Sequence, residues 1–413
     1  MKFLDRTAEM ARLMRLSDAG RGGLAVLWGR RRIGKSELLK EWCRRTDGLY
    51  TVADRSASAV QRQNFAVALA TRLPGFDAAI YPTWKVLFDA LSRQARSVDW
   101  HGPLAVDELP YWVESDESIV SVLQNWIDAE KRSGGLLVAF AGSSQHMMQG
   151  LVLDADSPIY GRADEKLKLQ PIGIQYLQKG LGIRSAQDAV KAYAVWGGVP
   201  RYWELSQGER SLIQTLRRQV FSPLGVLRNE PSYLLLDNLK DSVQASSILA
   251  IVGMGVHRLS EIASRLQVPT TALSGPIRRL VELGLVRKET PFGCDVKGNK
   301  RSLYKVSDSF LGFWYRFVLP NYSDEGYLEG GDDCDEFRHG FDVYLGSVWE
   351  QLVRDSIPMR KVPGISERLR KVSRWWGNGT DGSAMELDVV AETSDGKTLL
   401  VGECKLTLSP KEA

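Results

Sequence analysis

The chain has 413 residues, of which 44% are hydrophobic and 25% are charged, and its formal net charge is +4. This length exceeds what one hydrophobic core normally organises, so we expect about two to four globular domains. No apolar run reaches the roughly 18 residues that a membrane-spanning helix needs. Charged residues also interrupt the amino-terminal segment where an export signal would need its apolar core. These features exclude a membrane partner and predict a cytoplasmic protein.

The four cysteines and four histidines are scattered along the sequence. Neither set has the spacing of metal ligands, and widely separated cysteines are typical of reduced thiols. We therefore expect no zinc site. The mild positive charge would favour a nucleic acid partner without demonstrating one.

The most informative segment joins an apolar run to a helix near the amino terminus. Residues 24–28 predict a buried parallel strand, and residues 37–42 continue as a helix. Between them lies the sequence GRRRIGKS, which fits the phosphate-binding template G-x-x-x-x-G-K-[ST]. Glycines let backbone N–H groups turn toward a phosphate, and the helix presents its positive end to it. The predicted nucleotide-binding residues are Gly29, Arg30, Arg31, Arg32, Ile33, Gly34, Lys35, Ser36 and Glu37.

Two side chains of this segment have predicted chemical roles. Lys35 would reach the β- and γ-phosphate oxygens, and the Ser36 hydroxyl would complete the ligands of Mg²⁺. ATP and Mg²⁺ are therefore the predicted cofactors. The alternative is a chance match in a long chain, and the flanking strand and helix argue against it.

A second apolar strand ends in an acidic pair. Residues 104–106 precede Asp107 and Glu108. Asp107 is predicted to hold Mg²⁺ through water, and Glu108 to polarise the attacking water. An accidental Asp-Glu pair is the alternative, but the position after the phosphate-binding loop supports a nucleotide site.

A third apolar strand, residues 136–141, is followed by Ser143 and Ser144. The carboxyl ends of neighbouring parallel strands meet at one crevice, so either serine is a candidate sensor of the γ-phosphate. A turn rich in small residues is the alternative interpretation for each serine.

Several motifs resemble those of the archaeal-type ATPases of the STAND class, which are AAA-like P-loop switch proteins. The sequence FLDRTAE at residues 3–9 is similar to the family's amino-terminal hallmark, with Asp5 where glycine is usual. Residues 147–148 and 157–162, after the third strand, and the sequence GGVPRY at residues 197–202 also resemble the family. The match extends over nearly the whole chain, and the P-loop is its most specific part.

The resemblance implies roles for three further residues. Arg6 and Glu9 would border the nucleotide, and Arg162 would sense phosphate, because the planar fork of an arginine pairs two phosphate oxygens. A structural ion pair after a turn is the alternative for Arg162. The predicted catalytic residues are Lys35, Asp107, Glu108 and Arg162.

A basic stretch in the second half has the pattern of a winged helix-turn-helix. A short helix over residues 259–266 and a second over 271–283 precede two strands, 284–288 and 303–306, with a basic wing between the strands. In this fold the second helix enters the major groove of double-stranded DNA and wing cations contact phosphates. The predicted DNA-binding residues are Thr271, Ser274, Arg278, Arg279, Lys297, Lys300 and Arg301.

Two alternatives remain for this module. Gly275 and Pro276 interrupt the second helix pattern, so the helix would instead begin at Pro276. Winged helices also dock proteins, so a protein partner is the alternative to DNA.

The carboxyl-terminal region predicts a hairpin with a possible metal site. Strands over residues 385–392 and 398–405 place Glu403 and Lys405 on one face, where Asp388 of the paired strand would converge with them. Glu350, on a predicted helix over residues 341–353, would join the same Mg²⁺. This constellation resembles the PD-(D/E)XK nucleases, although Leu387 replaces the usual proline and the domain would be truncated. An ordinary hairpin with solvated charges is the alternative.

Together these patterns predict an α/β fold with a P-loop NTPase parallel sheet flanked by helices. A helical lid, a winged helix-turn-helix and a partial restriction-endonuclease-like α/β domain would follow. The predicted boundaries are 1–172, 173–240, 241–318 and 319–413. Two roles compete: an ATP-hydrolysing switch that controls a DNA- or partner-binding module, and an ATP-regulated DNA-processing protein with a metal-dependent nuclease. A third hypothesis is that the chain binds ATP without hydrolysing it. The chain could also associate with further copies of itself to form a homo-oligomer.

Overall fold

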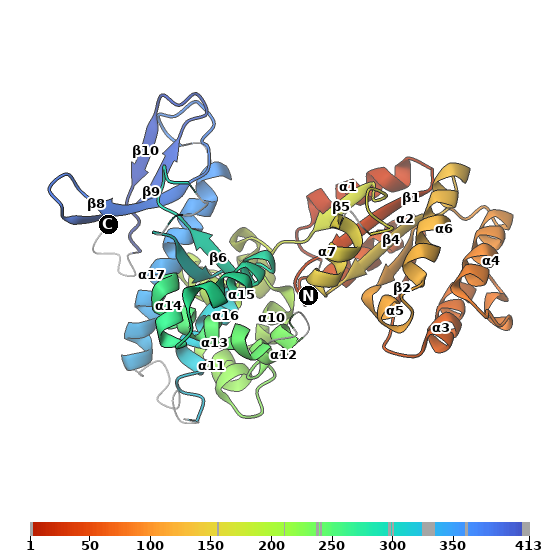
Figure 1. Cartoon of the computed structure of the whole chain (residues 1–413), viewed down its shortest axis with the longest axis horizontal. Helices are drawn as coiled ribbons and strands as arrows, with labels where there is room; N and C mark the ends of the chain where they lie inside the picture. Colours follow the sequence, from red (N-terminus) through yellow and green to blue (C-terminus); the bar gives the residue numbers. More distant parts are fainter. Residues whose placement is uncertain are drawn as a thin grey trace. The chain divides into compact units, whose positions relative to one another are not determined.

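The computed structural model describes residues 3–154, 157–209, 211–236, 239, 242–295, 299, 301–323, 335–359 and 362–406. The chain divides into two compact units (Figure 1). The first unit comprises Met1–Ile172 with Val199–Arg201, and the second comprises Gly173–Gly198 with Tyr202–Ala413. The chain therefore passes between the units more than once.

The first unit is built on a five-stranded sheet in the order β2-β3-β4-β1-β5. Every pairing in it is parallel. The two strands β1 and β4 are buried along their whole length, as expected for apolar runs covered on both faces. The strands are β1 (Gly23–Trp28), β2 (Leu49–Val52), β3 (Leu104–Asp107), β4 (Leu137–Gly142) and β5 (Glu165–Lys168). This arrangement confirms the predicted α/β fold with a parallel sheet.

Helices flank this sheet (Figure 1). They are α1 (Thr7–Asp18), α2 (Lys35–Thr46), α3 (Ser58–Ala70), α4 (Trp84–Ser97), α5 (Pro110–Ser115), α6 (Ile119–Ser133) and α7 (Gln145–Leu153), with a short 3-10 helix, η1 (Phe76–Ala78). No helix among the described residues combines the length and apolar character that crossing a bilayer requires.

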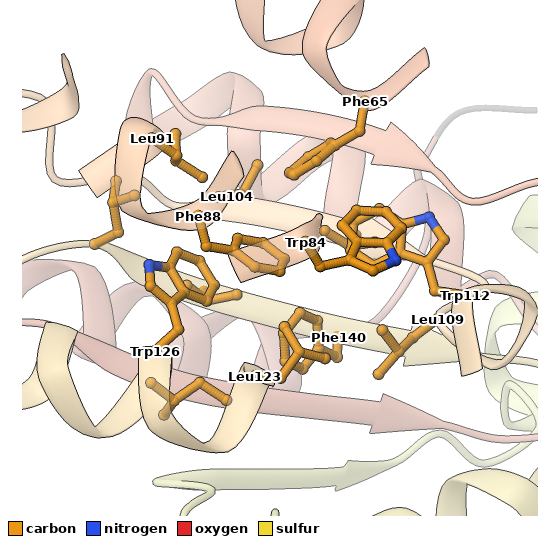
Figure 2. Close-up of a cluster of buried hydrophobic side chains, with 14 of the residues drawn as sticks. Phe65, Trp84, Phe88, Leu91, Leu104, Leu109, Trp112, Leu123, Trp126 and Phe140 are labelled. Atoms are coloured by element: carbon orange, nitrogen blue, oxygen red, sulfur yellow. The ribbon is translucent and has the colours of Figure 1, made fainter. Parts of the chain in front are cut away.

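An aromatic core holds α3, α4 and α6 against the sheet (Figure 2). Phe65 meets Trp112 edge to face, with the ring centroids 4.9 Å apart, and Phe88 stacks on Trp126 at 4.5 Å. Trp84 lies 4.5 Å from Trp112. Offset and edge contacts of this kind add to the free energy of burying large side chains. The core therefore stabilises the strands whose carboxyl ends carry the acidic pair.

The second unit begins with short helices, over the segment predicted to be helical. These are η2 (Ile174–Tyr176), α8 (Leu177–Leu181), α9 (Ala186–Trp196), α10 (Pro200–Ser206), α11 (Leu212–Leu216), the π-helix η3 (Arg217–Phe221) and α12 (Glu230–Leu236). Three helices and an antiparallel pair of strands follow: α13 (Ser242–Gly253), α14 (Leu259–Arg265), α15 (Thr270–Glu282), β6 (Val286–Glu289) and β7 (Leu303–Val306).

Helix α15 runs through Pro276 without a break. The alternative prediction that this helix begins at Pro276 is therefore wrong. Proline removes the N–H that would bond to the carbonyl of Ala272, but the usual clash with the preceding residue is reduced because Gly275 has no Cβ. A Cβ built on Gly275 would meet no atom within 4 Å, so the helix surface there is open.

The carboxyl-terminal part combines a helix with a small antiparallel sheet. Its elements are α16 (Ser309–Phe313), the π-helix η4 (Trp314–Val318), α17 (Asp335–Ser356), a 3-10 helix η6 (Ile357–Met359), β8 (Ser373–Asn378), β9 (Ala384–Glu392) and β10 (Leu399–Gly402). The sheet order is β10-β9-β8. The predicted hairpin is present as β9 and β10, but β10 ends at Gly402, so Glu403 and Lys405 lie beyond the strand.

Candidate nucleotide site

The loop between β1 and α2 has a backbone that only certain residues tolerate. Gly29 has φ of 155° and Gly34 has φ of 95°. A Cβ on Gly29 would lie 2.8 Å from the carbonyl oxygen of Leu169, so a side chain there would require the loop to move. Arg32 adopts a left-handed conformation with φ of 66°. The loop therefore makes the compact turn that the phosphate-binding template predicts.

Arg6 packs against this loop from the amino terminus. Its side chain is buried, and it donates to the carbonyl of Ile33 at 2.9 Å and to Glu9 at 3.1 Å. Asp5 and Arg6 both have positive φ, of 60° and 67°. The left-handed backbone at Asp5 gives a physical reason for glycine at the equivalent position of the resembling family.

Lys35 begins α2 and folds back onto the loop. Its Nζ donates to the carbonyl oxygens of Gly29 at 3.0 Å and Arg30 at 3.2 Å, and the residue is only 5% exposed. Burial lowers the pKa of Lys35, while the charges of Glu108 and Asp107 oppose this shift. Glu37, in contrast, is exposed and pairs with Lys40 at 3.0 Å, so its side chain leaves the loop.

Asp107, at the end of β3, receives three hydrogen bonds. Its Oδ2 accepts from the hydroxyl of Ser36 at 2.6 Å and from the hydroxyl of Tyr50 at 2.9 Å. Its Oδ1 accepts from the backbone N–H of Glu108 at 3.0 Å. The residue is 2% exposed. The structure thus joins the serine of the loop to the acid of the second strand, as the sequence predicts for a nucleotide site.

Tyr50, on β2, is a residue that the sequence analysis missed. Burial and the charge of Asp107 raise the pKa of Tyr50, so its hydroxyl remains a donor at neutral pH. The hydrogen bond depends on the pairing of β2 with β3, which places Val52 opposite Asp107. Strand pairing is not visible in the sequence, although a tyrosine two residues before a strand end was an available signal.

Glu108 turns away from Asp107 and meets Ser143 at the end of β4. Its Oε2 accepts from the backbone N–H and from the hydroxyl of Ser143, each at 3.0 Å. Glu108 has φ of 55°, an unusual conformation for a residue with a side chain. Ser144 instead caps α7, where it accepts from the N–H of Met147 at 3.4 Å. Ser143 therefore lies against Glu108, whereas Ser144 caps a helix.

Arg162 does not lie at this site. It makes two hydrogen bonds to the carboxylate of Asp128, each 2.9 Å long, and one to the carbonyl of Pro158. Arg162 precedes β5, whose first residue pairs with Ala25 of β1, so it lies at the amino edge of the parallel sheet. The phosphate-binding loop follows β1 and lies at the carboxyl edge. The length of β1 separates these edges by roughly 20 Å. The predicted phosphate-sensing role is corrected to the alternative, a structural ion pair.

The GGVPRY segment reaches the loop through Pro200. A Cβ on Gly34 would lie 3.7 Å from Cγ of Pro200. Val199–Arg201 belongs to the first unit, although the residues on both sides belong to the second.

The residues of the site suit a magnesium ion. Ser36 and Asp107 supply hydroxyl and carboxylate oxygens, which are the ligands that Mg²⁺ prefers. No group of three or more histidine, cysteine, aspartate or glutamate side chains among the described residues has metal-binding geometry. A pair of oxygen ligands fits Mg²⁺ because this ion usually takes its other ligands from water and substrate phosphates.

The predicted DNA-binding residues divide into three groups. Thr271, Ser274 and Arg278 are exposed on α15, and Arg279 is half-buried. Arg301 donates to Sγ of Cys294 at 2.9 Å and therefore bonds within its own hairpin. Two further predicted residues, Lys297 and Lys300, lie outside the described residues.

An ion cluster links the β6–β7 hairpin to β8. Glu289 pairs with Arg287 at 2.7 Å, with Lys305 at 3.7 Å and with Arg374 at 3.8 Å. The carbonyl of Arg374 also accepts from the N–H of Phe292 at 2.9 Å. Burial alone would raise the pKa of Glu289, but the charges of Arg287, Lys305 and Arg374 outweigh it and lower the pKa to about 2. This contact joins segments that are far apart in the sequence, and no sequence pattern predicted it.

The predicted nuclease residues do not converge. Glu403 and Lys405 pair with each other at 3.2 Å, and their side chains are 73% and 77% exposed. Asp388 instead accepts from the backbone N–H of Cys404 at 2.8 Å. The predicted meeting of Glu403 and Lys405 with Asp388 is therefore wrong in this structure, because β10 ends before these residues.

Glu350 does lie near Asp388, as predicted. Burial and the charge of Asp388 raise the pKa of Glu350. A cation, Arg354, lies beside the two acids: it is 3.6 Å from Glu350 and donates to the backbone carbonyl of Asp388 at 2.8 Å. The described part of the chain therefore holds an acid pair with an arginine here, and no metal-binding cluster.

Comparison with protein families identifies two regions. Residues 3–205 match an ATPase domain predominantly from Archaea. Residues 314–413 match a family of archaeal and bacterial proteins of unknown function. The first region is therefore similar to archaeal-type ATPase domains.

Comparison with individual proteins finds one relative in sequence and two solved structures of similar fold. An uncharacterized protein of Methanocaldococcus jannaschii is 26% identical over 404 residues, which cover 98% of this chain and 87% of that protein. The Walker-type ATPase of Pyrococcus abyssi aligns with a TM-score of 0.58 at 18% identity, over 76% of this chain and 96% of that one. The ORC2 protein of Aeropyrum pernix aligns with a TM-score of 0.51 at 14% identity, over 77% and 94%. These two structures show a shared fold.

Proposed function

We propose that the chain binds ATP with Mg²⁺, hydrolyses it, and uses the nucleotide state to change what its second unit offers to DNA or to a protein partner. The observation that carries this proposal is the network at the carboxyl edge of the parallel sheet. There Asp107 bonds to Ser36, and Lys35 lies folded on the loop. The relation to the Aeropyrum protein, which was solved in complexes with ADPNP and ADP, supports a nucleotide at this place.

Lys35 is the group that would move toward the phosphates. Its ammonium now bonds to neutral carbonyls, and a charged phosphate oxygen is a stronger partner. The backbone N–H groups of the loop and the amino end of α2 would surround the same anion. Ser36 and Asp107 would hold Mg²⁺ by a hydroxyl and, through water, by a carboxylate, and the bound ion would offset phosphate charge.

Glu108 is the proposed base for hydrolysis. Two donors of Ser143 bond to Oε2 of its carboxylate and lower the basicity of the group, so release of either donor would make Glu108 a better base. The oxygens of a γ-phosphate would accept from Ser143 instead. ATP binding would thereby free Glu108 at the moment when a base is needed.

The GGVPRY segment supports a link from the nucleotide to the second unit. Pro200 lies beside Gly34 of the loop, while Tyr202 and Trp203 are buried in the second unit. Tyr202 donates to Glu230 at 2.8 Å, and Trp203 donates to the carbonyl of Gly197 at 2.7 Å. A displacement of the loop on nucleotide binding would therefore be transmitted along a few covalent bonds.

The module of α13, α14, α15, β6 and β7 is proposed as a winged helix in which α15 reads DNA. The exposure of Thr271, Ser274 and Arg278 on one helix supports this role. Docking of the hairpin on β8 leaves the helix as the main DNA-contacting element. The arrangement of Glu403 and Lys405 does not favour a nuclease, so DNA cleavage is not part of this proposal.

Nucleotide binding and turnover of the purified chain test the proposal. We expect ATP binding and phosphate release with Mg²⁺, and a change in turnover when double-stranded DNA is added. Lys35→Ala should lower ATP affinity at least about tenfold, because one charge-assisted contact to phosphate is lost. Lys85→Ala, which changes an exposed lysine of α4 in the same unit, is the matched control and should bind normally. Absence of ATP binding by the unaltered chain would refute the proposal.

A further inference from the structure

Tyr50 contacts Asp107 of the nucleotide site, and none of the roles proposed above involves this tyrosine. Its hydroxyl donates to Oδ2 of Asp107 at 2.9 Å. We propose that Tyr50 is a positioning residue for the metal: it holds Asp107 so that one direction of that carboxylate remains open toward Mg²⁺. This inference rests on the proposed ATP and Mg²⁺ binding.

The hydrogen bonds of Asp107 can be counted against its capacity. A carboxylate offers about four lone-pair directions, two on each oxygen. Ser36 and Tyr50 occupy Oδ2, and the N–H of Glu108 occupies one direction of Oδ1. One direction of Oδ1 remains, and it is the one available to a water of the metal.

The position of Tyr50 is set by two neighbouring elements. In the parallel pairing of β2 with β3, Tyr50 is opposite Ala105 and Val52 is opposite Asp107. Side chains two residues apart on a strand share a face, so Tyr50 and Asp107 lie on the same face of the sheet. On that face Nζ of Lys40, from α2, lies 5.4 Å from the centroid of the Tyr50 ring. The ring is therefore held between the edge strand and the helix that carries Ser36.

Loss of the Tyr50 hydroxyl would leave Asp107 with fewer constraints. Oδ2 would keep only the bond from Ser36, and the carboxylate would rotate more freely about its side chain. The Ser36 oxygen presents its lone pairs to the metal only while its hydrogen is directed at Oδ2. Binding of the metal would then include the cost of ordering both groups, so metal affinity should fall while contacts to the phosphates stay the same.

The test compares Tyr50→Phe with the unaltered full chain, using Mn²⁺ as the probe. The protein is loaded with a non-hydrolysable ATP analogue, and free Mn²⁺ is measured by electron paramagnetic resonance. We expect the Kd for Mn²⁺ to rise about fivefold, the size of one lost hydrogen bond. Affinity for the analogue in the presence of EDTA should stay within about twofold. Tyr81→Phe is the control, because it removes a hydroxyl that donates to the carbonyl of Phe76 in the same unit.

The outcomes are distinguishable. If the unaltered chain does not bind the analogue, the proposed function fails. If the chain binds it and Tyr50→Phe binds Mn²⁺ as tightly as before or more tightly, the positioning role of Tyr50 is wrong. Equal losses of metal-free and metal-dependent binding would also overturn it, because a general structural defect would then explain both.

Discussion

The hydroxyl and the backbone N–H of Ser143 both donate to the same oxygen of Glu108, at 3.0 Å each. The two residues lie at the ends of the neighbouring strands β4 and β3. Two donors on one carboxylate oxygen lower its ability to accept a further proton from water. The proposed base is therefore held in a less active state.

Ser143→Ala should raise the basal rate of ATP turnover severalfold. The variant removes one of the two donors and leaves Glu108 more free to accept a proton, whereas the KM for ATP should rise, because the hydroxyl that would donate to the γ-phosphate is lost. Steady-state phosphate release measures both quantities. Ser144→Ala is the control, since this change removes only the cap of α7, costs about 1 kcal/mol of stability and leaves turnover unchanged. A large fall in the turnover of Ser143→Ala would show that Ser143 promotes catalysis.

Arg162→Ala should reduce stability without changing ATP affinity. The variant breaks the two-bonded pair with Asp128 at the edge of the sheet opposite the phosphate-binding loop. Because the pair is partly exposed, we expect a loss of about 1 kcal/mol, visible as a fall of a few degrees in Tm. Calorimetric titration with ATP should give the affinity of the unaltered chain. Loss of ATP affinity with an unchanged Tm would restore the phosphate-sensing role.

Glu289→Gln should destabilise the contact between β6, β7 and β8 at neutral pH. The pKa of Glu289 in the folded chain is about 2, below the ordinary value of 4.5 for a glutamate. A carboxylate with a lowered pKa contributes stability above pH 4.5 and loses that contribution as the pH falls from 4.5 to about 2. The size of this contribution at pH 7 is about 3 kcal/mol, since one pKa unit corresponds to about 1.4 kcal/mol.

Hydrogen exchange of the strand amides measures this effect. Between pH 5 and pH 3, the amides of β6, β7 and β8 should lose protection more steeply in the unaltered chain than in Glu289→Gln. Over this interval the Glu289 carboxylate begins to take up a proton, and its contribution to stability falls. Glu392→Gln, which removes an exposed partner of Arg370, is the control and should have little effect. Equal slopes for the two proteins would contradict the assignment.

Arg278→Ala should weaken the binding of double-stranded DNA and make it less dependent on salt. Arg278 is exposed on α15, and its ion-pair partner in the described part of the chain is Glu282, at 3.9 Å. Removal of one phosphate contact lowers the slope of log affinity against log salt by about one. Fluorescence anisotropy over a salt series measures this slope. Arg370→Ala changes an arginine of the carboxyl-terminal sheet region and serves as the control. The same decrease in the salt slope in both variants would indicate that nonspecific charge, and not α15, attracts DNA.

A compact loop between β1 and α2 could be predicted from the sequence because its requirements are local. Gly29 and Gly34 adopt backbone angles that favour glycine, and Lys35 begins a helix directly after them. The acidic pair was also found, since an apolar strand followed by Asp107 and Glu108 is a local pattern. The partners of these acids, Tyr50 and Ser143, depend on the strand order β2-β3-β4 and so on pairings between distant segments.

The amino-acid sequence by itself determined the glycine-bounded loop, the apolar strands and the hairpin, because backbone preference and side-chain alternation act over a few residues. Only the tertiary structure decided which side chains meet. Arg162 lies at the opposite edge of the sheet because β5 joins β1 in parallel, and Glu403 and Lys405 face solvent because β10 ends at Gly402. The physical reason is that hydrogen bonds and ion pairs require proximity in space, and the packing of the whole unit sets that proximity.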